Sequence, residues 1–189
     1  MTRNADLDGM KKFTYFLKRI YRLSLGVEQQ EALVWKDLKE FYTNLGCRFG
    51  VYEKEKCIEV VLKIAEDQTA SFFQTVHEYY FTSRVKVLDD FPVEQTSELF
   101  ILATHFNNLL KRGSVLVNVN HGYVEYCFSR ELLIPLLYSG EIEDQVKVHY
   151  STSEDVHWAF HRLIDEHEEP AIVIADLLKK KREEEESSQ

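Results

Sequence analysis

The sequence contains little proline and glycine, which interrupt helices and strands, and little cysteine, which forms disulfide cross-links. Its 189 residues include three prolines, seven glycines and three cysteines. So little proline and glycine argues against long linkers. The cysteines (Cys47, Cys57 and Cys127) are odd in number and form no CxxC pair, which argues against a disulfide framework. We therefore expect a cytoplasmic protein without structural disulfides.

Long apolar runs and excess positive charge are also missing. No window of 18 apolar residues occurs, and the first ten residues are largely polar, so the sequence predicts neither a membrane span nor a secretory signal. The net charge is −9 and the pI is near 5.3. Phosphates of nucleic acids and anionic membrane surfaces repel a chain of this charge. We expect neither nucleic acid nor a membrane among its partners.

The motifs of common catalytic sites are absent as well. The sequence contains no GxSxG, no phosphate-binding GxxxxGK[ST] and no GxGxxG. His157 and His161 stand one helical turn apart, a spacing that can bind zinc, but Trp158 replaces the glutamate expected after the first histidine. No third ligand follows at motif spacing. The sequence therefore predicts no metal, no cofactor and no enzyme.

What the chain does contain is enough apolar material for one domain. Hydrophobic residues make up 44% of the sequence and aromatic residues 13%, which suffices for a core. We expect a single domain over residues 1–178, composed of an N-terminal helix pair (9–45) and a core (46–178). The remaining residues, 179–189, form a charged tail.

Alternation of apolar and polar residues predicts strands after the helix pair. Residues 48–54 and 57–67 fit a hairpin that turns near residues 53–56. Residues 71–88 also fit a helix through Phe72, Val76 and Tyr79, but their aromatic and β-branched content favours strand. A helix follows over residues 91–113, and its apolar stripe includes Leu99, Leu102 and Phe106.

The next stretch, NVNHGYVEYCF (118–128), raises the question of whether His121 and Cys127 form a reactive pair. A turn near Asn120–Gly122 makes the region a hairpin. An even-numbered loop separates two faces cleanly. The face towards the helix then holds Val115, Val117, Val124, Tyr126 and Phe128, and the outer face holds Leu116, Asn118, Tyr123, Glu125 and Cys127. His121 therefore lies at the loop tip, and the two residues do not meet.

The C-terminal part is less regular in pattern. Pro135 and Gly140 limit any helix in residues 129–150 to a turn or two. A helix over residues 151–167 begins at Ser153 or a neighbouring Ser/Thr as its cap, and Pro170 opens a last helix. These elements together predict an α+β fold in which helices cover one face of an antiparallel sheet.

Two segments resemble the YbjN-like proteins and the related type III secretion chaperones. The segment LATHFNNLLKRGSVLVNVNHGYVEYCF (102–128) resembles the centre of that family: a helix with an Asn near its end, a Gly, and a hairpin that turns on a Gly. IDEHEEPAIVIADLL (164–178) is similar to its final segment, and the resemblance spans roughly residues 45–178. It implies a small acidic cytoplasmic protein, commonly dimeric, that binds a partner polypeptide and catalyses nothing.

The expected function is therefore partner binding, chaperone-like or regulatory, by a homodimer. The partner-binding residues that we predict are Leu116, Tyr123, Cys127, Leu136 and Tyr138, because they are apolar residues that one domain does not readily bury. The alternative is a small-molecule or enzyme-like pocket between sheet and helices that uses His77, His105 or Tyr79.

Overall fold

A computed structural model of the protein describes residues 14, 16, 17, 20–131 and 139–187. Its helices are α2 (Val27–Leu45), α3 (Thr96–Leu109), α4 (Ser139–Asp165) and α5 (Pro170–Ser187), with a short 3-10 turn at Val93–Gln95. Its strands are β1 (Phe49–Tyr52), β2 (Cys57–Ala65), β3 (Gln68–His77), β4 (Tyr80–Asp89), β5 (Ser114–Asn118) and β6 (Tyr123–Glu131). No helix in these ranges is long and apolar enough to cross a membrane.

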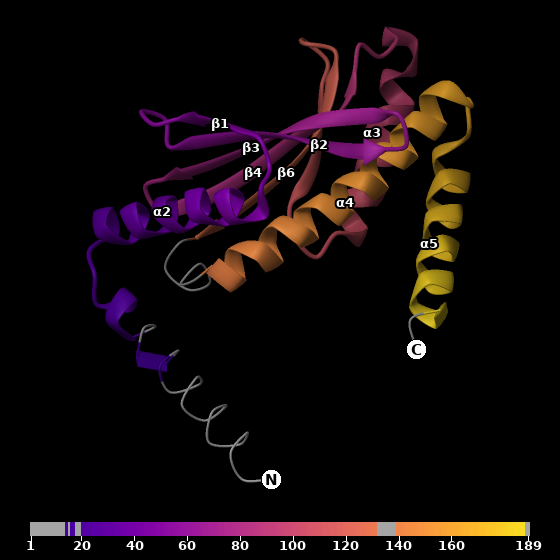
Figure 1. Ribbon diagram of the computed structural model, residues 1–189. Coiled ribbons are helices and arrows are strands. Elements are labelled where there is room, and N and C mark those ends of the chain that lie inside the picture. The colour runs from indigo at the N-terminus through magenta and orange to yellow at the C-terminus, as the bar shows by residue number, and fades with distance from the viewer. Residues whose placement is uncertain (1–13, 15, 18–19, 132–138, 188–189) are drawn as a thin grey trace.

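The six strands form one antiparallel sheet in the order β1-β2-β3-β4-β6-β5. Helices α2, α3 and α4 contact the strands, whereas α5 packs on α3 and α4. In Figure 1, α2 and α4 lie along the same side of the sheet, and α5 stands beside the far end of α4. The α+β fold class predicted from the sequence is confirmed.

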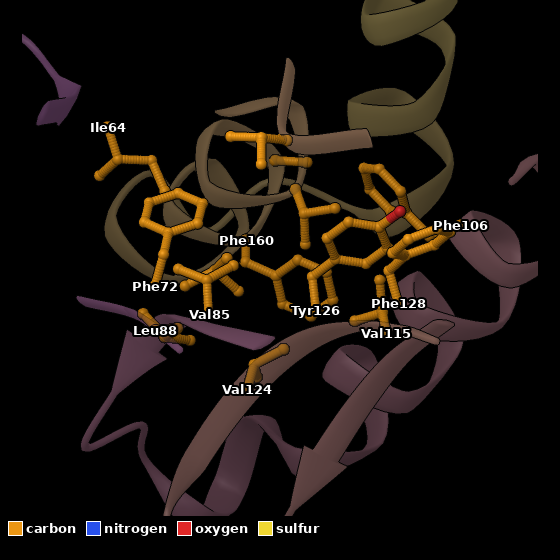
Figure 2. Close-up of a cluster of buried hydrophobic side chains, with 14 of the residues drawn as sticks. Ile64, Phe72, Val85, Leu88, Phe106, Val115, Val124, Tyr126, Phe128 and Phe160 are labelled. Atoms are coloured by element: carbon orange, nitrogen blue, oxygen red, sulfur yellow. The ribbon is translucent and has the colours of Figure 1, made fainter. Parts of the chain in front are cut away.

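The core forms where alternate strand residues meet the helices. Ile58, Phe72, Phe81 and Val124 are buried from the sheet side, and Phe160 is buried from α4. Figure 2 shows these layers meeting, with side chains of β4, β5 and β6 turned towards Phe106 and Phe160. The long apolar side chains interdigitate on this one face, and this burial is the main stabilising term of the fold.

The predicted hairpin and its register are confirmed. Asn118 pairs with Tyr123 across a four-residue loop, an even number. Val115, Val124, Tyr126 and Phe128 are buried on the helix side, together with the half-buried Val117. The strand assignment of residues 71–88 is also confirmed, because it forms most of β3 and β4, joined by a turn at His77–Tyr80. The turn at residues 53–56 joins β1 to β2.

The sequence reading of residues 129–150 is wrong, because α4 already begins at Ser139 and runs for 27 residues. Gly140 lies inside its first turn rather than ending a helix. Ser153 is not a cap: it is buried in mid-helix, and its hydroxyl donates to the His149 carbonyl at 2.7 Å. Pro135 lies outside the described residues. A serine whose hydroxyl bonds to its own helix backbone does not mark a helix start, which explains the error at Ser153.

The described N-terminal residues follow their sequence pattern, whereas the C-terminal end departs from it. Of the first predicted helix, residues 14, 16, 17 and 20–23 are described and are helical. Arg22 forms an ion pair of 2.6 Å with Asp37 of α2. At the other end, α5 continues through the charged residues as far as Ser187, where Lys180 and Glu184 pair along the helix. Within α2, Val34 and Leu38 are buried as expected, but Leu45 is exposed.

Asn107 of α3 closes part of the sheet edge at β5. Its side-chain amide donates to the Val115 carbonyl at 3.0 Å and accepts from the Val115 backbone N–H at 2.7 Å. It therefore takes the place of a neighbouring strand at this residue. We expect Asn107→Ala to lower the free energy of unfolding by about 1–3 kcal/mol, since two edge groups lose their partners. Urea denaturation measures this, and Asn108→Ala on the same exposed turn is the control. Equal stability of both variants would contradict it.

Candidate partner-binding surface

The sheet face that points away from the helices is not covered by any described element. We call this surface the open sheet face. Along each strand, alternate residues point towards it and are exposed or half-buried, whereas the residues between them are mostly buried against the helices. The open sheet face comprises Tyr52, Cys57, Glu59, Val61, Phe73, Thr75, Thr82, Arg84, Lys86, Leu116, Tyr123, Glu125, Cys127 and Ser129. A two-layer fold leaves such a face available for binding.

The structure brings three of the predicted partner-binding residues together on this face. Leu116 of edge strand β5 is exposed and pairs across with Glu125. Tyr123 is half-buried, with the Lys86 ammonium 4.5 Å from its ring centre, and its hydroxyl accepts from the Asn118 amide at 3.1 Å. Cys127 is half-buried between Arg84 of β4 and Ser114 of β5. The other two predicted residues, Leu136 and Tyr138, lie outside the described residues.

The chemistry of the open sheet face favours contact rather than reaction. Burial, and then the charge of Glu125, raises the pKa of the Cys127 thiol, so the thiol stays protonated and is a poor nucleophile at neutral pH. Apolar and charged side chains alternate along one row, where Arg84 stands between Phe73 and Cys127. Lys86 and Glu125 stand opposite each other on adjacent strands in the next row. Such a mixture is typical of non-obligate protein interfaces, which are about as polar as the rest of a protein surface.

The two edges of the sheet differ in what they can offer. At β5, Asn107 already occupies the outward N–H and C=O of Val115. At the other edge, β1 is only four residues long, and its Val51 and Tyr52 are exposed. Short edges of this kind limit strand addition. The open sheet face therefore offers a partner more than either edge does.

The histidine pair weighed as a zinc site has other partners. His157 and His161 have ring centres 4.2 Å apart. The His157 Nε2 contacts the Gln68 amide oxygen, and the His161 Nδ1 lies 2.9 Å from the Asp165 carboxylate. Burial, and then the nearby His161, lowers the pKa of His157 to about 4. Among the residues that the structure describes, no three His, Cys, Asp or Glu side chains gather closely enough to hold a metal ion.

These histidines line an open cavity of about 650 Å³ between the β2–β3 turn, α4 and α5. Trp158 lies in it with the Arg162 guanidinium 4.9 Å and the Lys180 ammonium 5.6 Å from its ring centre. Arg162 in turn pairs with Asp176, at 2.9 Å. These polar groups of the cavity thus bond to one another. A ligand site needs polar groups that converge on a free centre instead.

The residues named for the alternative pocket do not lie in that cavity. His77 and Tyr79 line a separate shallow hollow beside Glu31 and Lys56. His105 is exposed on α3. The structure therefore places His77 and Tyr79 at one hollow and His105 elsewhere, so the three do not form one site.

A second apolar feature was not foreseen from the sequence. An apolar groove of about 290 Å³ lies between α2, β2 and α4. It is lined by Phe41, Leu45, Leu62, Val146 and Tyr150. Only the long-range contact between α2 and α4 creates it, and no local pattern reports that contact.

Comparison with known proteins identifies the fold and little more. No family model and no curated protein matches the chain. Among solved structures, YbjN from E. coli, described as a candidate transcription regulator, matches with a TM-score of 0.54 and 9% identity over 69% of this chain and 93% of YbjN. The Yersinia pestis type III secretion chaperone SycH, solved with a fragment of YscM2, matches with a TM-score of 0.42 and 10% identity over 64% of this chain and 96% of SycH. The likeness to YbjN confirms the YbjN-like fold that the sequence resemblance implied.

Proposed function

We propose that this chain is a non-catalytic partner-binding protein, chaperone-like or regulatory, that acts in the cytoplasm as a homodimer. The observation that carries the proposal is the open sheet face: six strands are covered by helices on one side only. YbjN, which shares the fold, is described as a candidate transcription regulator. A regulator works by contact with other macromolecules, and the acidic charge of this chain favours a protein over a nucleic acid.

The proposed partner-binding residues are Leu116, Tyr123 and Cys127, together with Leu136 and Tyr138. Tyr123 is already fixed by Lys86 and Asn118, so little side-chain freedom is lost when a partner covers it. The polar residues around the three support a transient complex, because a permanent interface is more apolar. The enzyme-like alternative has less support, since the groups in the cavity at Trp158 pair with one another.

The test compares two leucines of equal exposure on different faces. Leu116 on the open sheet face and Leu109 at the end of α3 are each 46% exposed. We expect Leu116→Asp to weaken binding of the protein captured from native cytoplasm at least tenfold, roughly 1.4 kcal/mol. The reason is that the partner would have to bury an unpaired carboxylate. Titration of the captured, purified partner against each variant measures the loss.

Leu109→Asp is the matched control and should bind like the wild-type chain. Equal losses in both variants would show that a general change of charge is responsible. Unchanged binding by Leu116→Asp would remove the open sheet face from the proposal.

A further inference from the structure

An apolar stripe lies uncovered on the N-terminal helical segment. Phe16, Leu17, Ile20 and Leu23 repeat at the spacing of one helix face. Each of these side chains is about half exposed in the structure. In Figure 1 the described part of this segment lies below the N-terminal end of α2, away from the sheet and from α4. Four large apolar side chains on one exposed helix face are more than a monomer usually leaves in water, and such a patch marks an interaction site.

The apolar groove between α2, β2 and α4 is the complementary feature. Phe41, Leu62, Val146 and Tyr150 line it, and Leu45 stands exposed at its rim. Two of its charged neighbours are already engaged at the border: Lys147 and Glu143 pair with each other. The groove's 290 Å³ equals about ten water molecules at roughly 30 Å³ each, which is room for the tips of apolar side chains.

The stripe does not fill the groove of its own chain in the structure. Its four side chains remain about half exposed, and none of them lines the groove. Arg22, beside the stripe, is held to α2 by its ion pair with Asp37. The groove is therefore open to an occupant from another molecule.

Charge favours a second copy of this chain as that molecule. Residues 10–22 hold five basic residues and no acidic one. The whole chain carries −9, and this segment +5, so the remainder carries −14. The segment is therefore attracted to the body of another copy, and two like chains approach each other in this orientation with the least repulsion.

We propose that the N-terminal stripe of each copy docks in the apolar groove of the other, in a reciprocal two-fold exchange. The inference rests on the homodimer of the proposed function. It assigns the second copy to the apolar groove, which is separate from the open sheet face. A two-fold axis makes both contacts identical, so each dimer has two. The open sheet face remains free for the other protein partner.

Four single substitutions test the exchange by light scattering over a range of concentrations. The wild-type chain should give a dimer of 44.6 kDa, twice 22.3 kDa. Ile20→Asp in the stripe and Leu45→Asp at the groove should each give a monomer. Ile101→Asp, on α3, is the control for Ile20, since both side chains are 49% exposed; it should remain a dimer, and so should Leu116→Asp.

Mixing the two monomeric variants distinguishes an exchange between copies from any contact within one. Ile20→Asp keeps an intact groove and Leu45→Asp an intact stripe, so a mixed dimer regains one of the two contacts. We expect the mixture to form a heterodimer that dissociates at higher concentration than the wild-type dimer. A mixture that stays monomeric would overturn the proposal, and so would a dimeric Ile20→Asp.

The same measurements separate this inference from the proposed function. A wild-type monomer at every concentration would overturn the exchange and the homodimer, while partner capture lost in Leu116→Asp would still support the open sheet face. A monomer produced by Leu116→Asp alone would place the second copy on the sheet and overturn the groove. Circular dichroism confirms folding of each variant, and Leu17→Asp replaces Ile20→Asp if the latter unfolds.

Discussion

Replacing Gly113 by alanine should lower the free energy of unfolding by at least about 3 kcal/mol. Gly113 joins α3 to β5 with a φ of 75°, a left-handed conformation that costs an L-residue roughly 1–2 kcal/mol. A Cβ placed there would lie 2.7 Å from the Cys127 carbonyl oxygen and 2.8 Å from the Tyr126 ring. The carbonyl belongs to a strand and cannot swing aside. The clash therefore adds strain of the kind that overpacking causes.

Gly46→Ala is the matched control for this variant. Gly46 has nearly the same φ, 72°, at the end of α2, but nothing lies within 4 Å of the position of a Cβ. It should cost only the conformational term, about 1 kcal/mol. Urea denaturation of both variants separates the two contributions. If both variants lost the same free energy of unfolding, β6 would have moved aside to accept the new Cβ, and its close approach to Gly113 would have no role.

The same hairpin shows why part of this fold is readable from the sequence. A shift of one residue in register would move each set of side chains to the other face of the hairpin. Only a loop with an even number of residues keeps Asn118 and Glu125 away from the valines. Alternation is a local property, so β5 and β6 follow from it. The open sheet face follows as well, because the residues excluded from the core on each strand must share the other face. Leu116, Tyr123 and Cys127 were placed on it correctly.

Helix α4 shows where local patterns fail. Its first half contains Gly140 and follows Pro135, and these two residues predict no more than a turn or two of helix. In the fold, Gln145 and His149 are buried. The Gln145 amide oxygen accepts from Arg112 at 3.3 Å. Tertiary contacts supply these partners, and no sequence window contains them.

The apolar groove could not be foreseen for the same reason. Phe41 and Val146 are far apart in the chain, and each fits the pattern of an ordinary helix stripe. Only their juxtaposition leaves a hollow between them. The N-terminal stripe was visible in the sequence, but its exposure was not, since a helix pair is expected to bury such residues.

Acid should destabilise the fold through His149. This histidine of α4 is 2% exposed and lies in the core, where its ring stacks on that of Tyr126 at 4.9 Å. Phe72 and Phe128 border it, and its Nδ1 lies 3.2 Å from the Ser83 hydroxyl. Its Nε2 is buried without a hydrogen-bond partner among the described residues. A second proton would have to enter this apolar site without an acceptor.

Burial lowers the pKa of His149 from 6.5 to about 4, and the hydrogen bonds that oppose this shift are weaker. The unfolded chain therefore binds a proton between these two values that the folded chain does not. The contribution of neutral His149 to the free energy of unfolding is therefore present in full above pH 6.5, and it is lost as the pH drops towards 4. For this one group the loss is about 2 kcal/mol between pH 7 and pH 5, and about 3 kcal/mol once the pH is below 4. His157, which is also buried and whose pKa is also lowered to about 4, changes stability in the same direction.

His149→Gln should flatten the dependence of unfolding free energy on pH by about 2 kcal/mol between pH 7 and pH 5, because glutamine does not titrate in this range. The variant loses some stability at pH 7, since the stacking on Tyr126 is removed. His105→Gln changes an exposed histidine of α3 and should leave the pH dependence of the wild-type chain intact. Urea denaturation at pH 7, 6 and 5 measures all three chains. If His149→Gln and the wild-type chain lose stability in parallel on acidification, protonation of His149 is not what limits the fold in acid.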